Sequence, residues 1–217
     1  MGTKAFLIDT SKCIACKACQ VACKQWNELP AEKTVNQGTF QNPPDLSAVT
    51  WTLVRFKEVS NNGKMRWNFF KDQCRHCLEP PCKLSSTVNG SIIQDETGAV
   101  IYTKKTRYEN FEDIMCPYNI PRQDKNTMVL FKCTMCVDRV KNGLLPACVK
   151  ACPTGTMQFG DRKEMLEKGQ KRVEELKPVY VHASLIDAED VSVFYILIDE
   201  AQMYGMIRRE DVFSMFA

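Results

Sequence analysis

Residues 133–153 read CTMCVDRVKNGLLPACVKACP, and this stretch decides how the rest of the chain is interpreted. It holds a CxxC pair and, further on, two more cysteines, the last of which precedes a proline: Cys133, Cys136, Cys148 and Cys152. Cysteine runs that end in Cys-Pro are typical of iron–sulfur ligands, and in two-cluster ferredoxins the fourth cysteine of such a run binds the other cluster. The stretch therefore predicts that Cys152 joins ligands from elsewhere in the chain.

A second cysteine run lies near the N-terminus. Its steps of three, three and four residues give four thiols: Cys13, Cys16, Cys19 and Cys23. A loop of this kind can turn three thiolates toward one cluster while the fourth points away. The alternative is zinc, but structural zinc sites use two CxxC pairs with a longer spacer, or two histidines. The chain has only His76 and His182, so iron–sulfur ligation is favoured.

A third cysteine group reads CRHCLEPPC and supplies Cys74, Cys77 and Cys82. This group lacks a fourth ligand, whereas Cys116 stands alone and carries the following proline that terminal cluster ligands have. A lone cysteine is usually structural. Here, however, the unassigned Cys116 can supply the ligand that the third group lacks. His76 lies between two of these cysteines, and we expect it beside the ligands or at the surface rather than on the metal.

The ferredoxin rule sorts all 12 cysteines into three sets of four thiolates. Set 1 is Cys13, Cys16, Cys19 and Cys152; set 2 is Cys133, Cys136, Cys148 and Cys23; set 3 is Cys74, Cys77, Cys82 and Cys116. No cysteine is left over, so the scheme predicts three 4Fe-4S clusters. A disulfide scaffold is the other explanation of many cysteines, but such scaffolds are usually small secreted chains with a signal peptide.

This ligand pattern predicts an α+β fold of two ferredoxin-like units, one inserted in the other. Residues 1–30 plus 128–160 are expected to form the unit with two clusters, and residues 66–127 the inserted unit with one. Residues 31–65 are expected to form a connecting loop and a hairpin, and residues 161–217 a C-terminal extension with a helix and a strand.

Local patterns predict the individual elements. Strands are expected at residues 5–9, at 50–59 and 64–70 around the Asn61-Asn62-Gly63 turn, at 91–94 and 99–103 as a hairpin, and at 191–199. A helix is expected at residues 162–177, with a capping box formed by Asp161 and Glu164. Several apolar residues near the cysteines are expected to exclude water, or equally to be ordinary core: Ile14, Val21, Met135, Val137 and Val149.

Composition bounds the function further. The net charge is +3, so no strong field for binding nucleic acid follows, and no basic-aromatic pattern supports a nucleic-acid module. No apolar run approaches the roughly 18 residues of a membrane span. The N-terminus MGTKAFLIDTSKC lacks a signal-peptide core, so we expect no export address on this chain.

The residues around the cysteines resemble those of the iron–sulfur (beta) subunits of formate dehydrogenases, within the wider class of four-cluster subunits of molybdopterin oxidoreductases. The resemblance extends over about residues 5–177. It is carried by four stretches: the cysteine run at 13–23, CRHCLEPPC at 74–82, CPYNIPR at 116–122 and, above all, KCTMCVDRVKNGLLPACVKACPTGTMQFG at 132–160. The four-cluster pattern has cysteines at four positions where this chain has Ser86, Thr106, Glu109 and Glu112. One whole cluster is therefore missing, which resembles the soluble two-subunit formate dehydrogenases of sulfate-reducing bacteria.

The resemblance implies an electron-transfer subunit with no catalytic residue of its own. Formate and CO2 would interconvert at a molybdopterin site with tungsten or molybdenum in a large partner subunit, and a soluble c-type cytochrome would be the acceptor. Sets 1 and 2 would lie nearer the partner, and set 3 would be the exit. Export alongside the partner implies the periplasm, with the cytoplasm as the alternative. A subunit of a polysulfide, nitrite or sulfoxide reductase and a free-standing polyferredoxin are the competing interpretations.

Overall fold

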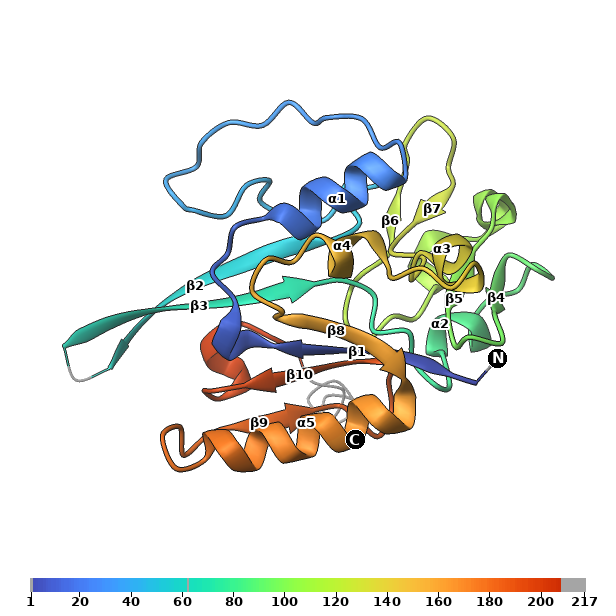
Figure 1. The fold of residues 1–217 in the computed structure, drawn as a ribbon. Helices are drawn as coiled ribbons and strands as arrows, with labels where there is room; N and C mark the ends of the chain where they lie inside the picture. The colour runs from blue at the N-terminus through green and yellow to red at the C-terminus, as the bar shows by residue number, and fades with distance from the viewer. Residues whose placement is uncertain (1, 62, 208–217) are drawn as a thin grey trace.

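The computed structural model describes residues 2–61 and 63–207, and a four-stranded sheet lies at its centre (Figure 1). The strand order is β8-β1-β10-β9. The bounds are Lys4–Asp9 for β1, Met157–Asp161 for β8, Ser184–Ile186 for β9 and Val193–Leu197 for β10. Strand β1 pairs in parallel with β10 and antiparallel with β8. The predicted α+β class is confirmed.

Strand β10 and residues 5–8 of β1 are apolar and buried because both faces of the sheet are covered. Leu7 and Phe194 pack in one core cluster with the apolar side of α5 (Arg162–Leu176). Phe6 and Tyr195 point to the opposite face and pack with cysteines of sets 1 and 2. Since side chains alternate along a strand, the same two strands support the helix on one side and the cysteine-bearing loops on the other.

Helix α5 confirms the predicted helix and lies along the sheet beside β9 (Figure 1). The predicted capping box is wrong, because both carboxylates have other partners. Asp161 stands at the N-cap position without a side-chain cap bond, and its Oδ1 accepts from Lys4 Nζ at 2.8 Å. Glu164 Oε1 accepts from Lys168 Nζ at 2.7 Å.

Gly169 lets α5 approach the sheet closely. A Cβ atom at this position would lie 3.0 Å from Leu185 Cδ1 and 3.2 Å from Leu7 Cδ1. We therefore expect Gly169→Val to lower the free energy of unfolding by about 1–3 kcal/mol through overpacking. Urea unfolding followed by circular dichroism measures this, with the exposed Lys171→Val as a control for valine in a helix. Equal losses in the two variants would contradict close packing at Gly169.

Three hairpins complete the strands. They are β2 (Leu53–Asn61) with β3 (Lys64–Asp72), β4 (Ile92–Gln94) with β5 (Val100–Tyr102), and β6 (Arg122–Gln123) with β7 (Leu130–Phe131). The first two confirm predicted hairpins, although the central turn residue Asn62 lies outside the described residues. The β2–β3 hairpin projects away from the sheet (Figure 1), and Trp67 on it is 57% exposed.

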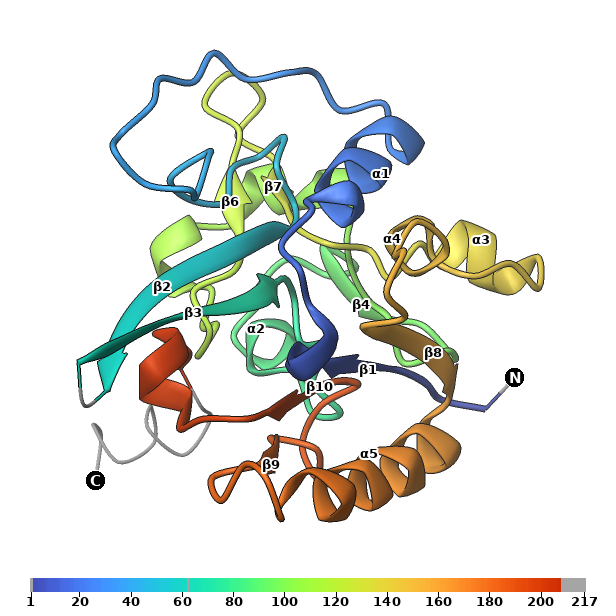
Figure 2. The same cartoon turned by 60° about the vertical axis from the view of Figure 1, so that its left-hand side comes forward.

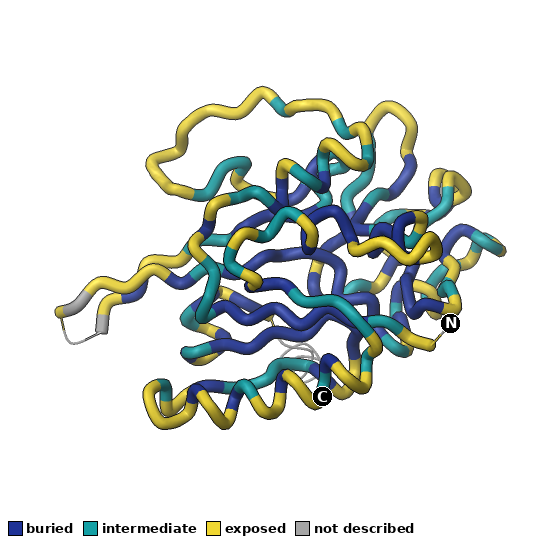
Figure 3. Tube along the Cα trace, in the orientation of Figure 1, coloured by how far each residue is buried: buried dark blue, intermediate teal, exposed yellow. Residues whose placement is uncertain are grey.

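Four short helices carry cysteines or follow them directly. They are α1 (Ala18–Trp26), α2 (Pro81–Leu84), α3 (Val137–Lys141) and α4 (Ala147–Lys150). Helices α1 and α4 lie side by side, whichever view is taken (Figures 1 and 2). Residues 30–46 form the predicted loop, which arches past α1 and is largely exposed (Figure 3). Of the predicted C-terminal extension, residues 208–217 lie outside the described part of the chain.

Candidate iron–sulfur site

The three CxxC loops share one local backbone geometry. The second residue after the first cysteine is Ala15, His76 or Met135, and its φ is 53°, 48° or 62° respectively. All three residues are buried. The backbone N–H of His76 donates to Cys74 Sγ at 3.4 Å, and that of Met135 donates to Cys133 Sγ at 3.4 Å. A positive φ is costly for residues other than glycine, so each loop holds backbone strain that aims an N–H at a sulfur.

The four cysteines of set 1 line one cavity. Cys13 and Cys16 come from the loop that precedes α1, Cys19 comes from the first turn of α1, and Cys152 comes from the turn between α4 and β8. Burial raises the pKa of the Cys152 thiol, but N–H groups of Met157, Thr154 and Thr156 together with the Thr154 hydroxyl outweigh it, and the net pKa is lowered. This turn is therefore built to hold a thiolate.

Set 2 gathers around α1 and α4. Burial raises the pKa of Cys23, and the neighbouring thiols of Cys133, Cys148 and Cys136 raise it further. Cys23 therefore faces the other members of set 2 and not the loop from which it follows. The pKa of Cys133 rises to about 12 and that of Cys136 to about 11, with burial as the largest cause in each case.

Set 3 brings the lone Cys116 to the CRHCLEPPC loop. Burial raises the pKa of Cys116 to about 12, and the thiols of Cys74 and Cys82 add to the rise. The N–H of Ile120 donates to Cys116 Sγ at 3.5 Å. Cys74 and Cys77 lie in one core cluster, against which Cys116 packs. The sequence assigns Cys116 to this loop only because the loop lacks a fourth ligand. The structure brings Cys116 and the loop together.

Set 2 adjoins both of the other sets. Cys19 of set 1 is an electrostatic neighbour of Cys148 of set 2. Cys133 of set 2 is in turn a neighbour of Cys74 of set 3. Sets 1 and 3 are therefore connected through set 2.

Two apolar residues do not lie where the sequence places them. Ile14 is 63% exposed and Val21 is 64% exposed, so in this chain they do not shield set 1 from water, and Cys16 beside them is exposed. Met135 and Val149 are buried as expected, and Val137 is half-buried. The expectation of shielding is wrong for Ile14 and Val21 because the loop before α1 and one face of α1 itself lie at the molecular surface.

His76 is fully buried, so the predicted surface alternative is wrong. Its Nδ1 accepts from the N–H of Val100 at 3.0 Å. Buried cations near the cysteines, among them Lys71, Arg75 and Lys132, were not expected from the sequence. The guanidinium of Arg75 lies 4.4 Å from the ring centre of Tyr195 and 5.2 Å from that of Tyr118. In the sequence, Arg75 directly follows Cys74 and Lys132 directly precedes Cys133. This adjacency is the signal that could have indicated both cations.

A polar network occupies the region of the four positions that lack cysteines. Glu109 is buried, and its carboxylate accepts from the hydroxyls of Ser86 (2.6 Å), Ser91 (2.5 Å) and Thr87 (3.0 Å) and from the N–H groups of Thr87 (3.1 Å) and Val88 (3.0 Å). Burial raises the pKa of Glu109, but these donors outweigh it and lower the pKa to about 2. Thr106 is also buried, whereas Glu112 is exposed.

The donor chemistry fits iron–sulfur clusters. Each set offers four sulfur atoms, and backbone N–H groups point at sulfur in all three sets. Thiolate ligation with N–H···S bonds is the arrangement that holds such clusters and tunes them. Separately, no helix within residues 2–61 and 63–207 is long and apolar enough to cross a membrane.

Two family models match the chain. Residues 65–162 match a 4Fe-4S dicluster domain, and residues 4–25 match a 4Fe-4S binding domain. With the cysteine sets described above, these matches define a 4Fe-4S iron–sulfur protein.

Similar proteins narrow the class. The chain is 50% identical over 210 residues to formate dehydrogenase 2 subunit beta (cytochrome c-553) of Nitratidesulfovibrio vulgaris, covering 93% of this chain and 96% of the relative. It is 45% identical over 208 residues to formate dehydrogenase subunit beta of Megalodesulfovibrio gigas, covering 93% and 97%. It is also 45% identical over 207 residues to the nitrate-inducible formate dehydrogenase iron–sulfur subunit of Escherichia coli, covering 92% and 70%. The chain belongs to the family of formate dehydrogenase iron–sulfur subunits. It is an electron-transfer subunit, and catalysis resides in a partner subunit.

Proposed function

We propose that the chain holds three 4Fe-4S clusters, one in each cysteine set, and connects a molybdopterin site containing tungsten or molybdenum in a large partner subunit to a soluble acceptor. The observation that carries this proposal is the way the sets adjoin: Cys19 and Cys148 share one buried core cluster, and Cys133 and Cys74 share another. A continuous line of redox sites is what an electron-transfer subunit requires. A bound cluster accepts and releases one electron at a time.

The protein groups have distinct tasks in this proposal. The thiolates of each set are the ligands, and the N–H groups of Ala15, His76 and Met135 stabilise the sulfur charge. The core residues around sets 2 and 3 keep water away from them. We further propose that residues 1–30 plus 128–160 and residues 66–127 form two nested ferredoxin-like units.

The exposed side chains around set 1 support docking of the large partner subunit there. Cys16, Ile14 and Val21 are all exposed on the loop and helix that supply this set. Exposed apolar side chains next to a redox site suit a surface that a partner covers. Set 3, which adjoins set 2, is proposed as the exit.

The acceptor is proposed to be a c-type cytochrome, because the name of the Nitratidesulfovibrio vulgaris relative includes cytochrome c-553. We propose a periplasmic location reached by export with the partner, and the cytoplasm is the alternative. Fractionation of the native host, with immunodetection of this chain, separates the two compartments.

The partner and the substrate are tested by affinity purification of the tagged chain from its native host. We expect a large subunit containing tungsten or molybdenum to co-purify, and the complex to reduce a c-type cytochrome with formate as the electron donor. This chain should contribute about twelve iron atoms, four for each cluster. A large subunit that turns over polysulfide, nitrite or a sulfoxide instead would contradict the formate assignment, and a stable monomer without any partner would indicate a polyferredoxin.

A further inference from the structure

Lys71 is a buried cation on the face of the β2–β3 hairpin that is turned toward set 1. It is 3% exposed and pairs across the hairpin with Val54. Both residues line the cavity formed by the four cysteines of set 1. Their strand neighbours Phe70, Asp72 and Arg55 line a separate pocket on the opposite face, as the alternation of side chains along strands requires.

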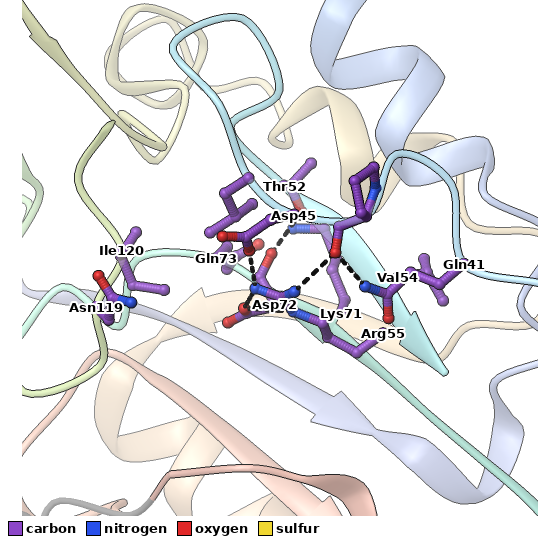
Figure 4. A network of polar contacts seen from close by, with 12 residues as sticks. Gln41, Asp45, Thr52, Val54, Arg55, Lys71, Asp72, Gln73, Asn119 and Ile120 are labelled. Atoms are coloured by element: carbon purple, nitrogen blue, oxygen red, sulfur yellow. Dashed lines mark hydrogen bonds and ion pairs between the residues drawn. The ribbon is translucent and has the colours of Figure 1, made fainter. Parts of the chain in front are cut away.

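The carboxylates near Lys71 are engaged on that opposite face (Figure 4). Asp72 Oδ2 lies 2.8 Å from Arg55 Nη2, and the same nitrogen lies 2.6 Å from Asp45 Oδ1. Asp45 also pairs with Arg122 at 2.7 Å. Among the residues that the structure describes, no carboxylate forms an ion pair with Lys71. The positive charge of Lys71 therefore acts on the neighbouring cysteines and is not neutralised by a carboxylate of the described chain.

The electrostatic neighbours of Lys71 belong to two different sets. Burial lowers the pKa of Lys71, but Cys148 and Cys133 of set 2 and Cys19 of set 1 outweigh it, and the net pKa is raised. The effect is mutual, since Lys71 opposes the burial-driven rise in the pKa of Cys19 and of Cys133. Lys71 therefore stands at the junction of sets 1 and 2.

The other buried lysine is placed differently. Lys132 Nζ donates to the carbonyl oxygen of Cys133 at 3.1 Å and to that of Val100, and it lies 4.8 Å from the ring centre of Tyr102. It acts electrostatically on Cys82 of set 3. Lys71 is thus the buried lysine that faces both sets 1 and 2.

We propose that Lys71 tunes the redox chemistry of the chain: its fixed positive charge raises the reduction potentials of the clusters held by sets 1 and 2. Reduction adds a negative charge to a cluster that its four thiolates already make anionic, and a nearby ammonium group stabilises the reduced form. The stabilisation is strong because a buried charge is weakly screened. This inference rests on the proposed ligation of the three sets.

The test is an EPR-monitored redox titration of the native complex carrying Lys71→Met. We expect the equilibrium constant for reduction of two clusters to fall by about tenfold, which is about 59 mV for a one-electron couple. The potential of the set 3 cluster should shift less than those of sets 1 and 2, because Lys71 is also an electrostatic neighbour of His76 between Cys74 and Cys77. Lys57→Met, an exposed change on the same hairpin, is the matched control and should shift nothing. Lys71→Arg keeps the charge and should retain potentials close to those of the wild type.

The outcomes separate this inference from the proposed ligation. A wild-type complex with three clusters, together with a Lys71→Met complex of equal iron content and unchanged potentials, would overturn the role of Lys71 alone. A wild-type complex without three clusters would overturn the ligation and this inference with it. If Lys71→Met does not assemble its clusters, Lys71→Gln is titrated instead. Loss of clusters 1 and 2 in both variants would assign Lys71 a structural role and contradict the proposal.

Discussion

Cys116→Ser should remove or convert one cluster and leave the other two intact. Cys116 reaches Cys74 and Cys82 from a separate part of the chain, and a serine oxygen is a poor substitute for a thiolate in this chemistry. Full loss of that cluster would lower the iron content of the complex by about four atoms. Because set 3 is the proposed exit, reduction of the cytochrome should fall as well.

Iron analysis and EPR spectroscopy of the reduced complex measure this result. The control is Met115→Leu, which changes the adjacent side chain at a position that is 60% exposed. Unchanged iron content and unchanged EPR signals in Cys116→Ser would show that Cys116 is not a ligand, and the composition of set 3 would then be wrong. Loss of signals from all three clusters would mean that the sets are not separate sites.

Glu109→Ala should destabilise the fold because it removes a shared hydrogen-bond acceptor. It would leave the hydroxyl and N–H donors of Ser86, Thr87, Val88 and Ser91 without their carboxylate acceptor. Ser91 is buried, but Ser86 and Val88 are half-buried and Thr87 is exposed, so water can satisfy part of the network. A buried donor left unpaired costs about 1–3 kcal/mol, and we expect the free energy of unfolding to fall by about that amount. Urea unfolding at neutral pH measures the loss. The exposed Glu112→Ala is the matched control and should stay within about 0.5 kcal/mol of the wild type.

The same carboxylate makes stability depend on pH. The pKa of Glu109 is about 2 in the folded chain, against about 4.3 for an unperturbed glutamate. A lowered pKa stabilises the fold above the unfolded value, and the stabilisation is lost as the pH falls toward the folded value. The difference in urea midpoint between the wild type and Glu109→Gln should therefore narrow as the pH drops below about 4.3. A difference that is constant from neutral pH to below pH 4 would show that the charge of Glu109 does not matter.

The cysteine spacing was informative because ligand geometry is local. Three or four thiols on one short loop must face a common point, and so Cys13–Cys19 and Cys74–Cys82 could be grouped without a structure. The distant members, Cys152 and Cys116, needed a rule about neighbouring clusters. The hairpins were predictable for a similar reason, since turn residues between alternating apolar runs act over a few positions.

Features set by tertiary contacts could not be predicted in this way. The burial of Lys71 follows from the folding of its hairpin over set 1, and no local pattern distinguishes it from the exposed Lys57. The capping box failed because Lys4, far away in the sequence, takes the carboxylate of Asp161. The exposure of Ile14 likewise depends on which face of its loop the rest of the chain covers.

The parallel pairing of β1 with β10 has a consequence for how the subunit is made. Residues 4–9 leave the ribosome early, but their partner strand at residues 193–197 is synthesised near the end. Under the proposed ligation, set 3 is complete once Cys116 has emerged, whereas sets 1 and 2 need Cys152 and Cys148. We therefore expect the set 3 site to be available for cluster insertion first, and the central sheet to close only after the other two sites are complete. Strand β1, which leads into the set 1 loop, therefore gains its partner β10 last, and we expect docking of the large subunit at set 1 to be a late step in maturation.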